Sequence, residues 1–233
     1  MKNQYFGDNR DLFKYDLIWH IMQTGLINHF TFIPMLTEDD DTEHGENRDR
    51  KKAKAGTENK PLVKFLDKYR VKSKRNIKEL EGFFKDRITI YGKNKYFSHL
   101  QRKEYFKQIE DKLLSKSLVF VDPDTGLQVE RSGKEHILYC EVKDLYKRMD
   151  KNSILMIYQH YPRMRTEKNI QQYFYERSEK LKNIAGDLPI YIDDNEIRFF
   201  FLTKDKSIQD SLGKQISKYK QSYPQLHMSK FLC

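Results

Sequence analysis

The stretch Leu118–Gly126, with the sequence Leu-Val-Phe-Val-Asp-Pro-Asp-Thr-Gly, decides how this chain is expected to fold. Its first four residues form a continuous apolar run, which is typical of an inner parallel strand covered on both faces. Pro123 then fixes the backbone angle φ, and Gly126 permits a tight turn. The stretch therefore predicts a buried strand that ends in a polar loop with two carboxylates.

Strands and helices are expected to alternate along the rest of the chain. Apolar runs predict further strands, and apolar residues at helical spacing predict the helices between them. The expected strands are Phe30–Leu36, Arg87–Tyr91, Ile154–Tyr158 and a closing pair, Ile190–Ile192 and Ile197–Leu202. The expected helices are Asp11–Gln23, Pro61–Tyr69, Asn76–Lys85, Tyr96–Leu114, Val142–Met149, Lys168–Ile184 and Ser207–Tyr219. This order favours an α/β fold with a mostly parallel sheet, helices on both faces and a C-terminal antiparallel hairpin.

Length and charge narrow the class of protein. The chain has 233 residues and a formal net charge of +10. We expect a single α/β domain over residues 1–233, with a polar loop or insertion at about residues 42–60. The charge indicates either a solvated basic surface or a polyanionic partner, with nucleic acid ahead of membrane. Cys140 and Cys233 lack metal or redox spacing, and no stretch resembles a membrane span or signal peptide. We therefore expect a cytoplasmic protein without a membrane partner, and the oligomeric state stays open.

Acidic residues follow two of the predicted strands. Ligands of such sheets bind at the carboxyl ends of the strands. Asp39 and Asp40 would hold a divalent ion or accept ribose hydroxyls there, unless they form a plain acidic loop. Asp122 and Asp124 direct two carboxylates toward one place, which raises a pKa or requires a cation, unless they belong to an ordinary turn. With Glu130 they make a candidate site for Mg²⁺ or Mn²⁺.

A third polar group follows the strand Ile154–Tyr158. His160 is a candidate general base or ligand, with a hydrogen-bonded structural histidine as the alternative. We assign Gln159 and Arg163 to substrate binding, because a guanidinium in this place suits a phosphate.

The first helix starts in a polar, glycine-containing segment with Asp8, Asp11 and Lys14. Free backbone N–H groups at a helix start can bind an anion, and N-capping by Asp8 or Asn9 is the simpler alternative. No Gly-x-Gly-x-x-Gly, Walker, Gly-x-Ser-x-Gly or zinc pattern is present in the sequence.

Two segments carry a resemblance to known enzymes. Gly7–Tyr15 resembles the opening motif of a ribosomal-RNA adenine methyltransferase family, which has Gly, Asp and Lys at this spacing. Asp122-Pro123 resembles the first half of the Asp-Pro-Pro-aromatic motif of the adenine-N6 branch, in which the Asp meets the target amino group. With the closing hairpin, these segments look like the Rossmann-like S-adenosylmethionine-dependent methyltransferases. Asp124 and Thr125 depart from that motif, and acidic residues stand where the family has its glycine-rich cofactor loop.

The chain also resembles a group of uncharacterised bacterial proteins. These share a Tyr-Phe-Gly-Asp start, an Asp-Pro-Asp-x-Gly loop and a Gln-His-x-Pro-Arg segment. This second resemblance supports the fold and implies no activity.

Three hypotheses about function follow. The resemblance implies S-adenosylmethionine-dependent N-methyl transfer to nucleic acid. The cofactor would then be bound by Asp8, Asp11, Lys14, Asp39 and Asp40, and the catalytic residues would be Asp122, Asp124 and His160. The second hypothesis is a nuclease or phosphoesterase that holds Mg²⁺ or Mn²⁺ with Asp122, Asp124 and Glu130. The third is a non-catalytic nucleic-acid or protein-binding module that uses the basic residues Arg50–Lys52.

Overall fold

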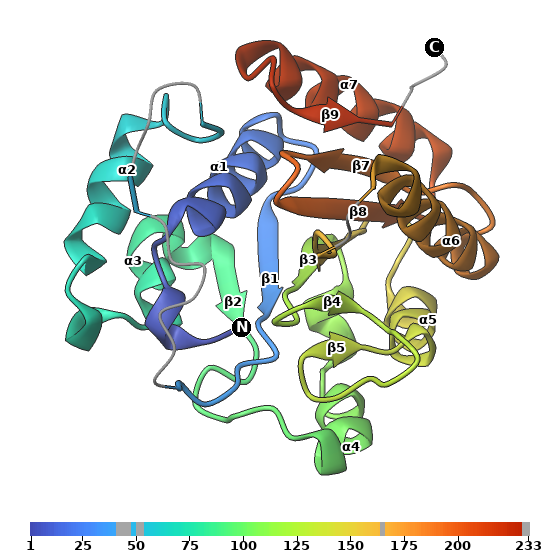
Figure 1. Ribbon diagram of the computed structural model, residues 1–233, viewed down its shortest axis with the longest axis horizontal. Coiled ribbons are helices and arrows are strands. Elements are labelled where there is room, and N and C mark those ends of the chain that lie inside the picture. The colour runs from blue at the N-terminus through green and yellow to red at the C-terminus, as the bar shows by residue number, and fades with distance from the viewer. Residues whose placement is uncertain (41–47, 50–53, 164–165, 230–233) are drawn as a thin grey trace.

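A mixed β-sheet with helices on both sides organises the chain (Figure 1). The structure is a computed structural model, and it describes residues 1–40, 48–49, 54–163 and 166–229. Much of the predicted polar loop at 42–60, including Arg50–Lys52, lies outside the described residues. In the described part of the chain, no helix is both long and apolar enough to cross a lipid bilayer.

The sheet has seven strands in the order β2-β1-β3-β6-β8-β7-β9. The strands are β1 (His29–Ile33), β2 (Ile88–Ile90), β3 (Ser117–Val121), β6 (Ile154–His160), β7 (Ile190–Asp193), β8 (Ile197–Thr203) and β9 (His227–Met228). β2, β1, β3 and β6 pair in parallel, and β8 lies antiparallel between β6 and β7. The α/β class, the parallel centre and the C-terminal hairpin are therefore confirmed. Two short strands, β4 (Gly126–Leu127) and β5 (His136–Ile137), pair separately.

Seven α-helices accompany these strands in the described residues. They are α1 (Asn9–Gln23), α2 (Lys60–Leu66), α3 (Glu81–Phe84), α4 (Arg102–Lys107), α5 (Tyr139–Arg148), α6 (Glu167–Ala185) and α7 (Lys206–Ser222). Short 3-10 helices lie at Asn3–Tyr5, Asp67–Tyr69, Lys72–Lys74, Ile77–Leu80, Lys85–Arg87, His99–Gln101 and Asp111–Leu114.

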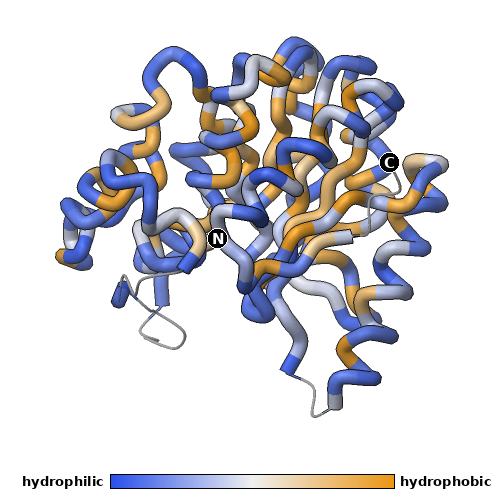
Figure 2. The backbone as a smooth tube through the Cα atoms, turned by 90° about the horizontal axis from the view of Figure 1, so that it is seen from above, coloured by the Kyte–Doolittle hydropathy of each residue, from blue (hydrophilic) through white to orange (hydrophobic). Residues whose placement is uncertain are grey.

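Alternate residues of the strands form two hydrophobic cores, one on each face of the sheet. Leu118 and Phe120 of β3 belong to the core under α1, α2, α3 and α7, whereas Val119 and Val121 belong to the core under α4, α5 and α6. These four side chains are fully buried, as expected for a strand covered on both faces. Figure 2 shows the hydrophobic stretches inside the molecule and the hydrophilic ones at its periphery.

Several predicted elements are shorter or divided in the structure, and the helix expected at Asn76–Lys85 is a 3-10 turn, Ile77–Leu80, followed by the four-residue α3. The strand expected at Phe30–Leu36 ends at Ile33, because Pro34 has no N–H to donate and Met35 turns the chain with a φ of +41°. The helix expected at Tyr96–Leu114 is divided into α4 and two 3-10 turns. Arg148 donates to the carbonyl oxygens of Phe106, at 3.0 Å, and Ile109. These contacts hold the segment that follows α4 against Arg148 of α5.

Candidate functional site

A polar cavity of about 240 Å³ lies at the carboxyl ends of β3 and β6, beside the start of α1. This is the edge of the sheet at which ligands of such folds bind. Its walls are Met1, Lys2, Tyr5, Asp8, Arg10, Asp11, Lys14, Asp122, Pro123, Asp124, Tyr158 and His160. Six residues predicted from the sequence, three from the first helix and three from the strand ends, therefore share one cavity.

A buried lysine joins two of the predicted carboxylates. Lys14 Nζ lies 2.9 Å from Asp122 Oδ2 and 3.1 Å from Asp11 Oδ1. Asp122 is 1% exposed, and the other two side chains are also buried. Carboxylates held this close require a cation, and here the Lys14 ammonium supplies it. The contact joins α1 to the end of β3 across 108 positions of sequence.

The local structure at the start of α1 fixes these groups. Asp8 is the N-cap and accepts a hydrogen bond from the Asp11 N–H at 2.9 Å. Asp11 in turn accepts from the Gly7 N–H at 2.8 Å, in the manner of a capping box. Gly7 has a φ of +82°, which disfavours any residue with a side chain. The N-capping alternative for Asp8 is thus correct, and Asp8 also lines the cavity.

Burial changes the protonation of these groups. Burial and the neighbouring carboxylate of Asp11 raise the pKa of Asp8 to about 7. Burial also raises the pKa of Asp122, although the nearby Lys14 ammonium opposes that shift. Burial disfavours the charge of Lys14, but the carboxylates of Asp122 and Asp11 outweigh burial and raise the pKa of Lys14. At neutral pH the cavity therefore holds a charged lysine, and Asp8 is close to half protonated.

Two aromatic side chains of β6 form the next wall of the cavity. Tyr158 and His160 are alternate residues of one strand, so they lie on the same face as Lys14. The Lys14 Nζ lies 4.6 Å from the centre of the Tyr158 ring, and the Tyr158 hydroxyl lies 3.5 Å from His160 Nδ1. Burial and the positive charge of Arg10 lower the pKa of His160, which keeps the imidazole neutral at neutral pH.

Asp124 also lines the cavity, at its more exposed side. Its Oδ1 lies 3.9 Å from the nitrogen of Met1, and its side chain is 30% exposed. The two carboxylates of the loop thus differ, because Asp122 is buried against Lys14 and Asp124 remains accessible.

Gln159, which the sequence assigned to substrate binding, does not line the cavity. It is fully buried on the opposite face of the sheet. Its Oε1 accepts from the Leu127 N–H at 2.9 Å, and its Nε2 donates to the His160 carbonyl at 2.7 Å and to the Tyr173 hydroxyl at 3.1 Å. Gln159 therefore holds the loop that follows Asp122.

Four other predicted residues lie outside the cavity walls. Asp39 accepts from the Gln4 N–H at 2.9 Å, and Asp40 binds Lys2 and the Gln4 side chain, so both fasten the N-terminal segment. Arg163 and Glu130 are exposed.

Glu130 thus does not join Asp122 and Asp124. Among the residues that the structure describes, no group of three or more His, Cys, Asp or Glu side chains is arranged to hold a metal ion. The predicted three-carboxylate set is therefore not assembled.

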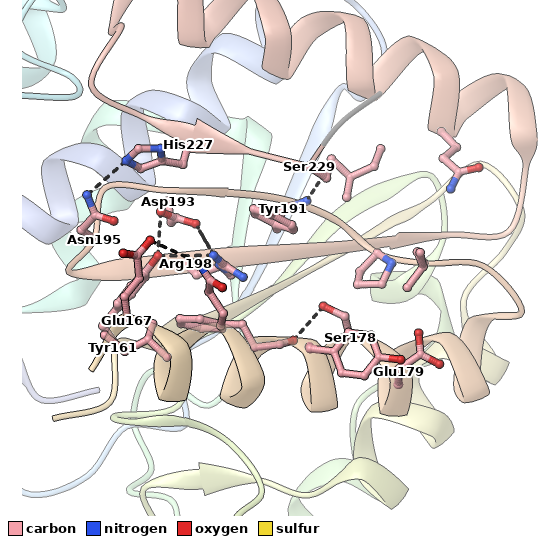
Figure 3. Close-up of a pocket in the computed structure, with 18 of the residues that line it drawn as sticks. Tyr161, Glu167, Ser178, Glu179, Tyr191, Asp193, Asn195, Arg198, His227 and Ser229 are labelled. Atoms are coloured by element: carbon pink, nitrogen blue, oxygen red, sulfur yellow. Dashed lines mark hydrogen bonds and ion pairs between the residues drawn. The ribbon is translucent and has the colours of Figure 1, made fainter. Parts of the chain in front are cut away.

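A second and larger cavity, of about 1020 Å³, lies between α6 and β7 (Figure 3). Arg198 lies in its wall, with its Cζ 3.7 Å from the Phe174 ring centre and 4.0 Å from that of Tyr191. Its Nη2 pairs with Asp193 Oδ2 at 2.7 Å, and Tyr161 donates to the other Asp193 oxygen at 2.8 Å. None of the residues predicted for the site lines this cavity. The smaller cavity is therefore the candidate site.

Several residues that line the smaller cavity were not predicted from the sequence, above all Tyr158, Arg10 and Tyr5. The period-2 alternation of β6 was the available signal for Tyr158, because it places residues 158 and 160 on one face and residue 159 on the other. Tyr5 and Arg10 carry no comparable signal, since their place depends on how the N-terminal segment packs.

Comparisons with known proteins add no relative: no family model matches this sequence, and no match was found among curated proteins or solved structures. The chemistry of the cavity itself therefore carries the functional argument.

Proposed function

We propose that the cavity is the active site of a nucleic-acid-directed enzyme on a methyltransferase-like, Rossmann-like fold, which transfers a methyl group from S-adenosylmethionine to an amino nitrogen. The observation that carries the proposal is the 2.9 Å contact between Lys14 and Asp122. These residues belong to the two segments on which the methyltransferase resemblance rests. Their meeting in one cavity is what a shared site requires.

The topology of the sheet supports the same proposal. The resemblance included a closing antiparallel hairpin, and β8 lies antiparallel between β6 and β7. The carboxyl ends of the parallel strands β3 and β6 border the cavity, as expected for a ligand site of such a sheet. The net charge of +10 suits a polyanionic substrate.

The side chains of the cavity suit the chemistry of the cofactor, but the volume of the cavity is small for the whole molecule. S-adenosylmethionine supplies a methyl group activated by a sulfonium. The carboxylates of Asp8 and Asp11 suit its positively charged groups and its hydroxyls. The cavity, at about 240 Å³, is smaller than the roughly 300–1,000 Å³ of sites for drug-sized ligands. It therefore accommodates part of such a molecule.

Each side chain then has a role that its geometry allows. Lys14 favours the ionised form of Asp122 and holds it in place, so that Asp122 can accept a hydrogen bond from the target amino group. Methylation of the amino nitrogen would release a proton from that nitrogen. His160 is neutral at neutral pH and can accept that proton.

Calorimetry and a transfer assay test the proposal. The wild-type protein is expected to bind S-adenosylmethionine and to transfer labelled methyl to unmethylated RNA or DNA. Asp122→Asn should lower the transfer rate by about 100-fold or more, because it weakens a preorganised acceptor. Asp187→Asn, an equal charge change at an exposed site at the other edge of the sheet, should leave the rate unchanged. Absence of binding at about millimolar cofactor, or full activity of Asp122→Asn, would contradict the proposal.

A further inference from the structure

The segment Lys68–Lys78, between α2 and α3, concentrates positive charge. It contains six basic residues and no acidic one, within a chain of net charge +10: Lys68, Arg70, Lys72, Lys74, Arg75 and Lys78. A run of basic residues is ordinarily a solvated surface. It becomes a candidate binding surface when its backbone is held in place and its basic side chains do not pair with carboxylates of the protein.

Arg75 fixes the segment to the protein. Its Nε donates to the Tyr69 carbonyl at 3.2 Å, its Nη2 donates to the Arg70 carbonyl at 2.8 Å, and its Nη1 donates to the Gln4 carbonyl. The Ile77 N–H also donates to Asn3 Oδ1 at 3.0 Å. The segment is therefore ordered against the N-terminal residues.

These contacts place the basic segment beside the candidate site. The ring of Tyr69 packs edge-on against Phe6, with 5.2 Å between ring centres. Phe6 follows Tyr5, which lines the cavity of Asp122 and Lys14. In Figure 1 the segment between α2 and α3 lies on the same side of the molecule as the N-terminal residues. A polymer bound along the segment thus passes close to the cavity.

The lysines of the segment are free to bind a partner. Lys68, Lys72 and Lys74 are exposed. Within the described part of the chain, no carboxylate lies at ion-pair distance from any of the three, whereas Arg70 pairs with Asp67 at 3.2 Å. The 3-10 turn Lys72–Lys74 presents two of them on neighbouring positions of one short element.

We propose that Lys68–Lys78 binds the phosphate backbone of the nucleic acid on which the neighbouring cavity acts. Lysine ammonium groups neutralise phosphates as point charges, without reading sequence, and release the counterions bound there. Such contacts set the position of the polymer, and the cavity selects the base. The inference rests on the proposed function for the identity of the substrate, but its test measures binding without the cofactor.

A pair of matched triple variants tests the inference. The first is Lys68→Gln, Lys72→Gln and Lys74→Gln. The control is Lys147→Gln, Lys151→Gln and Lys182→Gln, which removes three exposed lysines at the opposite edge of the sheet. Fluorescence anisotropy with single-stranded RNA, single-stranded DNA and duplex DNA, at several salt concentrations, gives affinity and its salt dependence. Equal melting temperatures of the three proteins confirm that the variants fold.

The first triple variant should bind its preferred nucleic acid about tenfold or more weakly at low salt. The slope of log affinity against log salt should fall by about 2, since each phosphate contact contributes roughly 0.7–0.9. The affinity of the control triple variant for nucleic acid should fall much less.

Equal losses in the two triple variants would overturn the inference. So would a loss of binding to vesicles of phosphatidylcholine and phosphatidylserine that equals the loss of binding to nucleic acid. Because the methyl-transfer assay measures the chemistry separately from binding, a protein that binds nucleic acid through Lys68–Lys78 without methyl transfer would refute only the proposed function.

Discussion

Asp8 is a group of the cavity whose protonation changes near neutral pH. Burial and the charge of Asp11 raise the pKa of Asp8 to about 7 in the folded protein, whereas an aspartate in the unfolded chain titrates near 3.9. The folded protein therefore binds this proton more tightly than the unfolded chain does. The resulting stabilisation is fully present below about pH 4 and is lost as the pH rises through 7.

The Asp8→Asn variant should not lose this stability as the pH rises, because asparagine does not titrate. Asparagine is neutral and is as good an N-cap as aspartate, so the start of α1 is preserved. The variant should match the wild type in unfolding free energy near pH 4 and exceed it above pH 7, by on the order of 4 kcal/mol. Urea unfolding between about pH 4 and 8 measures the difference. A difference that stays constant across this range would show that Asp8 does not titrate in this way.

At the scale of elements, the turn after β3 depends on a close contact between Gly126 and Gln159. Gly126 has a φ of +140°, and a Cβ on it would lie 2.5 Å from the Gln159 amide nitrogen. Gln159 in turn holds the Leu127 N–H at 2.9 Å. The glycine of the Asp-Pro-Asp-Thr-Gly stretch is therefore required by contact with β6 as well as by the turn.

Gly126→Ala should destabilise the protein by about 3 kcal/mol, because the methyl group meets a buried amide and the backbone angle disfavours alanine. Gly186→Ala is the matched control, since Gly186 also has a positive φ, +89°, but has open space around its Cα hydrogen. Its cost should be about 1 kcal/mol, from the backbone angle alone. Denaturant unfolding of both variants separates the two effects, and equal costs would contradict the role given to Gln159.

The order of the elements could be predicted from the sequence because the central strands are buried on both faces. Leu118–Val121 and Ile154–Tyr158 read as continuous apolar runs, and both lie in the sheet. The helix predicted at Tyr96–Leu114 could not be placed correctly. Its apolar residues belong to an aromatic cluster, in which the ring centres of Phe97 and Tyr105 lie 5.0 Å apart, and Arg148 of α5 binds the Phe106 carbonyl near the end of α4. The spacing of apolar residues along the sequence does not reveal such a contact.

At the scale of the whole molecule, the cavity combines segments that the sequence keeps far apart. The sequence predicted Asp122 and His160 to be neighbours only if their strands were adjacent, and β3 and β6 do pair directly in parallel. That Asp39 and Asp40 would fasten the N-terminal segment could not be predicted, because it depends on Lys2 and Gln4 folding across the end of the sheet. The position of Lys14 over Asp122 depends in the same way on how α1 packs.

The Lys14–Asp122 contact should therefore act as a tertiary link between α1 and the sheet. Lys14→Met leaves Asp11 and Asp122 facing each other without the ammonium, which should cost about 3–5 kcal/mol at neutral pH. The loss should shrink as the pH falls, because removing the lysine raises the pKa of Asp122 further and protonation then relieves the unpaired charge. Urea unfolding of the variant at about pH 5 and pH 8 measures this change.

A double-mutant cycle decides whether the contact is a specific link. Lys14→Met combined with Asp122→Asn should cost less than the sum of the single variants by about 1–3 kcal/mol, because each single change strands the other charge in a buried place. The exposed pair Lys206–Asp210, 3.3 Å apart, is the matched comparison, and its coupling should stay below about 1 kcal/mol. Lys14 and Asp122, unlike a surface pair, cannot replace their contact with hydrogen bonds to water unless the packing of α1 on β3 opens. A coupling energy as small as that of Lys206–Asp210 would therefore show that the pair does not hold the two elements together.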